Sequence, residues 1–181
     1  GIRPECMRVK KAPTAAIIDS QSVKTTTDHS GERGYDAGKR LVGRKRHILV
    51  DTLGLILLVS VHPANVQDRD GAKILLRQLA HQYGWIKLIW ADGGYAGKLI
   101  QWVEQIKRHR KVRLEIVKRS DKVTGFKVLP RRWVVERTFG WLSKYRRLSK
   151  DYETKIASSE AMIYIAMTRL IRTKNLLNTT F

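Results

Sequence analysis

Three acidic side chains in this sequence have the placement that metal-dependent phosphoryl transfer requires. Asp19 and Asp92 each follow a short apolar run, and Glu136 lies in a basic and aromatic segment, RRWVVERTFGWL. The carboxyl ends of neighbouring strands are where α/β sheets usually bind ligands. Three converging carboxylates repel one another unless a cation lies among them, and Mg²⁺ or Mn²⁺ prefers such oxygen ligands. Two ions about 3.5–4 Å apart would activate an attacking oxygen and stabilise a leaving one.

Each of these side chains also has a simpler interpretation. An aspartate after a strand is commonly a turn former or a helix cap. Glu136 lies four residues after Arg132, so the two can form an ion pair on a solvated helix face. Other carboxylates rank lower because they lie in expected loops or turns, or because they are expected to be the N-cap (Asp68) and a first-turn residue (Asp70) of a helix. The lower-ranked carboxylates are Asp28, Asp36, Asp51, Asp68, Asp70 and Asp121.

Hydrophobic periodicity indicates the framework that positions these side chains. The expected elements, in chain order, are a strand at 15–18, a long polar loop at 20–40, hairpin strands at 43–51 and 55–61, a helix at 68–83, a strand at 87–91, a helix at 97–108, a strand at 113–117, a basic loop at 118–129, and helices from 130 and at 158–172. Antiparallel strands followed by alternating strands and helices predict an α/β protein with a mixed five-stranded sheet flanked by helices. Residues 1–13 are basic and irregular and are expected to be a leader or linker.

Charge is the most unusual property of the composition. The chain has 36 Lys and Arg residues against 16 Asp and Glu residues, a net charge of +20. Such an excess predicts a polyanionic partner, and nucleic acid fits better than a membrane because no basic amphipathic membrane helix stands out. Each basic cluster alone could be a solubilising face, but together with interleaved aromatic residues they suit phosphate contacts and base stacking. The expected DNA-binding residues are Arg44, Lys45, Arg46, Arg132, Arg137, Lys144 and Arg146.

Cysteine content and hydropathy exclude two other classes of protein. Cys6 is the single cysteine, so an internal disulfide framework and a cysteine zinc site are excluded. The longest apolar run, 53–59, is too short for the ~20 residues that a membrane-spanning helix needs. We therefore expect a soluble cytoplasmic protein, associated with the nucleoid, with no membrane partner.

Five strings occur in order along this sequence: IIDSQSVKTT, RGYDAGKRLVGRKRHILVDTLGLIL, VHPANVQDRDGA, WADGGYAGK and RRWVVERTFGWLSKYRRL. Together they resemble the catalytic domain of bacterial insertion-sequence transposases of the DDE type, and more narrowly the insertion-sequence-five group. The likeness runs from about Thr14 to Arg172. The resemblance implies a ribonuclease-H-like domain over 14–181, with Asp19, Asp92 and Glu136 as the catalytic, metal-binding triad. It also implies cleavage of phosphodiester bonds at transposon ends and attack of the freed 3′-hydroxyl on target DNA, by a homo-oligomer on DNA.

The sequence departs from the family pattern in two respects. The related signature Tyr-x2-Arg-x3-Glu-x6-Lys keeps Arg132 and Glu136. Leu129 stands at its tyrosine position and Ser143 at its lysine position, with Lys144 one residue further on. Asp19 also comes too early to follow the amino-terminal DNA-recognition region of full-length members. This arrangement resembles the second reading frame of elements that frameshift, so the product of an upstream frame is an expected partner. Two alternatives stay open: a DNA-binding remnant or inhibitor of the full-length transposase, and a host nuclease of the same fold.

Overall fold

A mixed sheet of six strands forms the centre of this protein in a computed structural model that describes residues 13–26, 30–106, 112–117 and 132–178. The strand order is β2-β3-β1-β5-β6, and β4 pairs with β3 on the side away from β1. β1 is antiparallel to β3 and parallel to β5, so strand direction changes at β1. The strands are β1 (Ala15–Lys24), β2 (Gly34–Asp36), β3 (Leu41–Asp51), β4 (Ile56–Pro63), β5 (Leu88–Ala91) and β6 (Arg113–Ile116).

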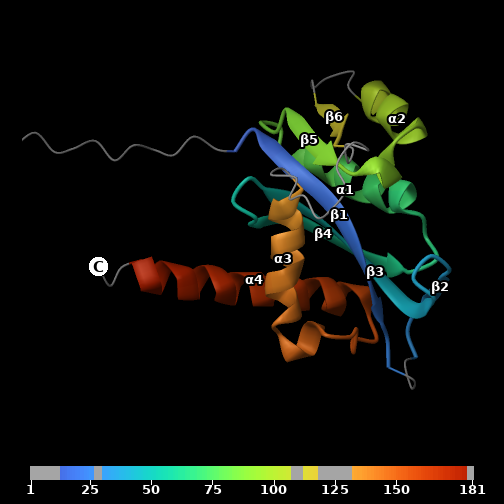
Figure 1. The fold of residues 1–181 in the computed structure, drawn as a ribbon, viewed down its shortest axis with the longest axis vertical. Helices are drawn as coiled ribbons and strands as arrows, with labels where there is room; N and C mark the ends of the chain where they lie inside the picture. Colours follow the sequence, from blue (N-terminus) through green and yellow to red (C-terminus); the bar gives the residue numbers. More distant parts are fainter. Residues whose placement is uncertain (1–12, 27–29, 107–111, 118–131, 179–181) are drawn as a thin grey trace, which may run out of the picture.

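Helices cover both faces of this sheet, which is the α/β layering expected from the sequence (Figure 1). α1 and α2 pack on one face, and α3 and α4 pack on the other. The helices are α1 (Asp68–Gln82), α2 (Lys98–Ile106), α3 (Trp133–Ser143) and α4 (Ile156–Asn178), with 3₁₀ turns η1 (Gly93–Tyr95) and η2 (Arg146–Leu148). In the described part of the chain, no helix combines the length and the apolar character that crossing a membrane requires.

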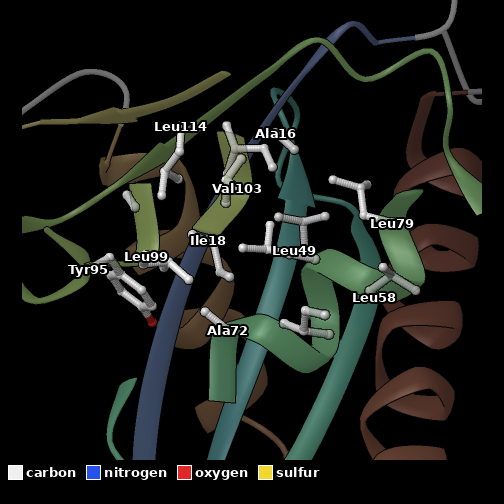
Figure 2. Packing of buried hydrophobic residues seen from close by; sticks show 14 of the residues in the cluster. Ala16, Ile18, Leu49, Leu58, Ala72, Leu79, Tyr95, Leu99, Val103 and Leu114 are labelled. Atoms are coloured by element: carbon white, nitrogen blue, oxygen red, sulfur yellow. The ribbon is translucent and has the colours of Figure 1, made fainter. Parts of the chain in front are cut away.

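The alternation of side chains along β1 explains the two apolar layers. Ile18 faces α1 and α2, where it packs with Leu49, Leu75 and Tyr95 (Figure 2). Ile17 points to the opposite face because successive strand residues alternate, and it joins the cluster under α3 and α4. The run at 15–18 is therefore apolar without interruption because both of its faces are buried.

The β3–β4 hairpin forms as predicted, and its turn shows why. The carboxylate of Asp51 accepts hydrogen bonds from the N–H groups of Leu53 and Leu55, both at 2.8 Å. Gly54 has a φ of +85°, in the left-handed region that glycine adopts without steric cost. The helices at 68–83 and 97–108 and the strands at 87–91 and 113–117 are also confirmed, within a few residues at each end.

Two expectations about the first part of the sheet were wrong. β1 does not end before Asp19 but continues to Lys24, and β2 lies inside the segment expected to be a loop, which raises the strand number from five to six. The polar residues of β1 are paired along β3, for example Ser20 with His47 and Ser22 with Lys45. Because the partner strand is itself polar there, no hydrophobic alternation marks this half of β1 in the sequence.

The outer edge of β4 is covered by side chains of α4. The N–H of Val59 donates to the hydroxyl of Tyr164 at 3.0 Å, and the N–H of Val61 donates to the carboxylate of Glu160 at 2.9 Å. Tyr164 and Glu160 are one helical turn apart, and the two N–H groups are two residues apart along the strand. Because these spacings match, side chains of α4 accept hydrogen bonds from backbone N–H groups of β4 that would otherwise be unpaired at the edge of the sheet.

Candidate active site

Strand register brings Asp19 and Asp92 to the same level of the sheet. β1 and β5 are parallel, and Ile17 is paired with Trp90. Asp19 lies two residues beyond Ile17, and Asp92 lies two residues beyond Trp90. Both side chains therefore leave the sheet on the face that α3 covers, immediately past the last paired residues of β5.

The turn after β5 holds Asp92 in a defined conformation. Its Oδ1 accepts a hydrogen bond from the N–H of Gly94 at 2.8 Å, which caps the 3₁₀ turn η1. A Cβ on Gly94 would lie 3.1 Å from that same oxygen, tighter than an ordinary contact, so glycine fits this position. A Cβ on Gly93 would meet no described atom within 4 Å. The two glycines therefore differ: Gly94 accommodates Asp92, and Gly93 leaves open space beside it.

Helix α3 adds Glu136 to this edge, with Arg132 between the carboxylates. The Nη2 atom of Arg132 lies 3.2 Å from Oε1 of Glu136 and 3.8 Å from Oδ2 of Asp92. The i,i+4 ion pair expected from the sequence is present, but it extends to a second carboxylate from a different element. The guanidinium of Arg132 thus contacts one carboxylate in the turn after β5 and one on α3.

The carboxyl of Asp19 is in an environment that disfavours its charged form. The pKa of Asp19 is raised to about 6, chiefly by burial and also by the neighbouring charges of Asp92 and Glu136. A hydrogen bond from the N–H of Ser20 at 2.7 Å and the charge of Arg132 act in the opposite direction without cancelling these effects. An added cation at this edge would stabilise the ionised form of Asp19.

The three carboxylates fit a divalent cation in their chemistry, but in this arrangement they do not enclose one. Within the described ranges, no group of three or more His, Cys, Asp or Glu side chains is placed to hold a metal ion. The cation present among them is the guanidinium of Arg132. Hard carboxylate oxygens around a shared cationic position are the ligand set that Mg²⁺ and Mn²⁺ prefer. The guanidinium of Arg132 therefore lies between two of the carboxylates that a metal ion would share.

The basic run at 44–46 does not lie on the surface as the sequence analysis expected. The exposed fractions of Arg44, Lys45 and Arg46 are 0%, 7% and 3%. Arg44 donates to the carbonyls of Glu153 at 2.6 Å and Thr154 at 2.7 Å, within the segment that connects η2 to α4. Their burial contradicts direct contact with DNA phosphates.

Strand alternation assigns these basic side chains to different faces of β3. Arg46, like Arg44, points toward α4 and donates to the carbonyls of Leu148 at 2.7 Å and Lys150 at 3.0 Å. Lys45 points toward α1, where it donates to the carbonyl of Val66 at 2.8 Å. The correction follows from charge-assisted hydrogen bonding, because buried cations satisfy backbone carbonyls that strand and helix ladders do not use.

The remaining predicted DNA-binding residues lie in or after α3. The guanidinium of Arg137 is stacked between the rings of Trp133 and Trp141 and donates to the carbonyl of Leu53 at 2.8 Å. It therefore ties α3 to the β3–β4 turn. Lys144 and Arg146 are exposed.

A shallow surface pocket lies next to these exposed basic residues. Arg146 lines it together with Arg147 and Tyr152, and its volume is about 390 Å³. Ser143, at the position where the family signature has lysine, donates to the carbonyl of Gly140 at 2.8 Å. The exposed positive charge in this part of the chain is thus carried by residues beyond Ser143.

One acidic residue near this edge was assigned too simple a role from the sequence. Asp68 was expected to cap α1, but the N-cap is Gln67, and Asp68 is the first residue of the helix. Its Oδ1 instead accepts hydrogen bonds from the hydroxyl of Ser20 and lies 2.9 Å from Nζ of Lys45. A signal for this role was present in the sequence. Lys45 and His47 alternate along β3 and so lie on one buried face, and two polar side chains there need a polar partner on α1, the helix that covers that face.

Comparison with known proteins identifies the family. The family model described as transposase DDE domain matches residues 10–171, a span that holds Asp19, Asp92 and Glu136 and all six described strands. No curated protein matches this chain. The chain therefore belongs to the transposase DDE domain family.

Proposed function

We propose that this chain is the catalytic domain of an insertion-sequence-five-group transposase with a ribonuclease-H-like fold, which cleaves DNA at transposon ends and joins the ends to target DNA. The observation that carries this proposal is that Arg132 lies 3.8 Å from Asp92, in the turn after β5, and 3.2 Å from Glu136 on α3, and that the charges of all three act on Asp19 of β1. Side chains so far apart in sequence converge when a site needs concentrated negative charge. The simpler interpretation, an ion pair between Arg132 and Glu136 on a solvated helix face, does not require further carboxylates nearby.

Asp19, Asp92 and Glu136 would hold one or two Mg²⁺ or Mn²⁺ ions. Ions bound there would activate the attacking oxygen and stabilise the leaving oxygen of the phosphodiester. Arg132 would contact a DNA phosphate bound at these carboxylates; the 22% exposure of its side chain supports this role. The attacking group is water in cleavage and the freed 3′-hydroxyl in strand transfer, so no covalent bond to the protein forms.

Exposed basic residues after α3 would bind the DNA backbone. Lys144 and Arg146 follow directly on the helix that carries Glu136, and the net charge of +20 favours a polyanion over the whole molecule. A homo-oligomer assembled on DNA and the product of an upstream reading frame are the proposed partners. The upstream product would supply recognition of the transposon ends.

Metal-dependent nicking of end-sequence DNA tests this function. The chain is fused to the upstream reading-frame product and assayed with Mg²⁺, Mn²⁺ or a chelator. Asp92→Asn and Glu136→Gln should reduce the nicking rate by at least ~10³-fold, since each removes a ligand of the ions that would activate the attacking oxygen and stabilise the leaving one. Glu104→Gln is the matched control, because it removes one carboxylate from an exposed position on α2.

The outcome distinguishes the alternatives. Nicking that survives Asp92→Asn would overturn the catalytic assignment. End-specific DNA binding without nicking in any divalent metal would favour the DNA-binding remnant or inhibitor. Nicking of DNA that lacks end sequences, at the same rate, would favour a host nuclease.

A further inference from the structure

Asp68 belongs to a polar group that lies behind Asp19, on the opposite face of β1. Its Oδ1 lies 2.9 Å from the hydroxyl oxygen of Ser20 and 2.9 Å from Nζ of Lys45, which is almost fully buried. Ser20 in turn donates its N–H to Oδ1 of Asp19 at 2.7 Å. A continuous set of hydrogen bonds therefore joins Asp68 to the first carboxylate of the candidate active site.

The second oxygen of Asp68 faces the turn that carries Asp92. Oδ2 of Asp68 and Oδ1 of Asp92 lie 3.8 Å and 3.1 Å from the position that a Cβ on Gly94 would take. Both carboxylates thus border the same small space at Gly94. The side chain of Asp68 is 38% exposed. Its Oδ1 is bound by Ser20 and Lys45, so Oδ2 is the oxygen that remains for a further contact.

Tyr95 supplies an independent observation at the same place. The side chain is buried, and among the described residues its hydroxyl makes no hydrogen bond of ordinary geometry, although the hydroxyl of Ser20 is near enough to affect it. Figure 2 shows the hydroxyl oxygen pointing away from the apolar side chains around the ring. The pKa of this phenol is raised well above 10, chiefly by burial and also by the charges of Asp19, Asp68 and Asp92, while the hydroxyl of Ser20 acts in the opposite direction. A buried hydroxyl that lacks a hydrogen bond of ordinary geometry, close enough to these carboxylates to be affected by their charges, supports a polar ligand at this position.

Two buried histidines, His47 and His62, are hydrogen-bonded to each other beside the polar group of Asp68, Ser20 and Lys45. Nδ1 of His62 donates to the carbonyl of Pro63 at 3.0 Å, so Nε2 of neutral His62 accepts from Nδ1 of His47 at 2.8 Å. A Cβ on Gly71 would lie 2.3 Å from Nε2 of His62 and 2.5 Å from Cε1 of His47. α1 can approach the pair only because glycine is at this position, and that close approach places Asp68 at the edge of the sheet.

We propose that Asp68 is a fourth carboxylate of the active site, a positioning residue that Lys45 and Ser20 fix and that strengthens divalent-cation binding by Asp19 and Asp92. This inference rests on the proposed function of the triad. The competing explanation is that Asp68 only complements the helix dipole of α1, as acidic residues in a first turn do. Asp70 has that role two residues later, where it is 57% exposed and pairs with Lys73 at 2.7 Å.

Asp70 therefore provides a matched control for a metal-binding experiment. Mn²⁺ binding to the full chain is measured by electron paramagnetic resonance of the free ion for the wild type, Asp68→Asn, Asp70→Asn and Asp92→Asn. Asp68→Asn should weaken Mn²⁺ binding about 10–100-fold, the usual effect of losing a residue that orients metal ligands. Asp70→Asn removes the same charge from the same helical turn and should change the affinity by less than ~3-fold, as expected for a screened surface charge.

The variants separate this inference from the proposed function. If Asp92→Asn loses Mn²⁺ binding and Asp68→Asn binds as tightly as Asp70→Asn, the role of Asp68 is overturned and the triad stands. If the wild type binds no Mn²⁺, or Asp92→Asn binds it as tightly as the wild type, the proposed function fails and the role of Asp68 fails with it.

Loss of Asp68 leaves the buried amine of Lys45 without its carboxylate, so folding is checked by thermal unfolding. Asp68→Glu keeps the charge and should recover most of the Mn²⁺ affinity. If Asp68→Asn does not fold, Ser20→Ala carries the test, because it breaks the link to Asp19 and leaves the Lys45 pair intact. Ser20→Ala should weaken binding at least ~3-fold, and wild-type affinity in that variant would overturn the proposal.

Discussion

Arg132 and Glu136 form an ion pair of 3.2 Å along α3, and the same guanidinium lies 3.8 Å from Asp92. The contact between Arg132 and Asp92 links the start of α3 to the turn after β5. A divalent ion bound by these carboxylates must therefore compete with a cation that belongs to the protein. DNA phosphate is the natural group to draw that guanidinium away, so DNA binding and metal binding are expected to be coupled at this residue.

Removal of this internal cation should strengthen metal binding in the absence of DNA. Arg132→Gln is expected to bind Mn²⁺ several-fold more tightly than the wild type, because the carboxylates lose a competing positive charge a few ångströms away. Isothermal titration without DNA measures the effect. Arg147→Gln is the control, since it removes an equal charge from an exposed pair with Glu153. Weaker Mn²⁺ binding by Arg132→Gln would show that the guanidinium supports the site rather than competing for it.

Ionisation of Asp19 should make the domain less stable as pH rises. Its folded-state pKa is about 6, against an ordinary value of 3.8, because burial disfavours the charged form. The folded chain therefore retains a proton that the unfolded chain has lost between these values, and stability falls as pH rises through 6. Asp19→Asn should unfold at a temperature higher by roughly 5 °C at pH 8 and show no difference at pH 4.

The pKa of Asp36 is shifted in the opposite direction to that of Asp19, so Asp36 serves as the control. A hydrogen bond from Ser22 lowers the pKa of Asp36, so its contribution to stability is present at neutral pH and is lost as pH falls. Asp36→Asn should therefore lower the unfolding temperature at pH 8 relative to pH 3. Thermal unfolding of both variants across pH checks the pair, and equal pH dependence of the two would contradict it.

Arg44 should matter for folding rather than for DNA affinity. Arg44→Met leaves the buried carboxylate of Asp151 without its cation and several carbonyls without a donor. The expected loss is about 3–5 kcal/mol in the free energy of unfolding, measured with urea. Lys150→Met, at an exposed position in the same connection, should change stability by less than ~0.5 kcal/mol. A stable Arg44→Met chain with weakened DNA binding would show that this residue contacts DNA.

Two helical glycines should respond in opposite ways to the same substitution. Gly71→Ala places a methyl group against the rings of His47 and His62 and should destabilise the chain by about 1–3 kcal/mol. Gly140→Ala meets no described atom within 4 Å and should stabilise α3 by about 0.5–1 kcal/mol. Denaturant unfolding of the two variants measures both values. Equal effects would mean that backbone propensity, and not the close approach of α1 to the histidines, governs Gly71.

The sequence predicted the core of this fold because apolar patterns report burial directly. The runs at 15–18 and 87–91 mark strands buried on both faces, and each is followed by the aspartate that was selected from it. The second half of β1 was missed because Ser20 and Ser22 are paired with polar residues of β3. A strand whose partner is polar shows no alternation in hydrophobicity, so its presence becomes evident only from its pairing with the neighbouring strand.

The charged residues were harder to assign for a related reason. Arg44 and Arg46 look like surface residues in the sequence, yet they are buried because unpaired carbonyls far along the chain need donors. Asp68 looked like a helix cap, since its contacts with Ser20 and Lys45 are set by register and not by local sequence. Charge composition predicts a polyanionic partner, but which cations remain free for it depends on tertiary contacts.

The covering of β4 by α4 also sets an order of events during synthesis. The partners of Val59 and Val61 lie 105 and 99 residues later in the chain. At about 5–20 residues per second, a nascent sheet waits roughly 5–20 s with this strand open to other chains. Crowded ribosomes translating the same message would make that interval the period of greatest risk of strand pairing between neighbouring copies.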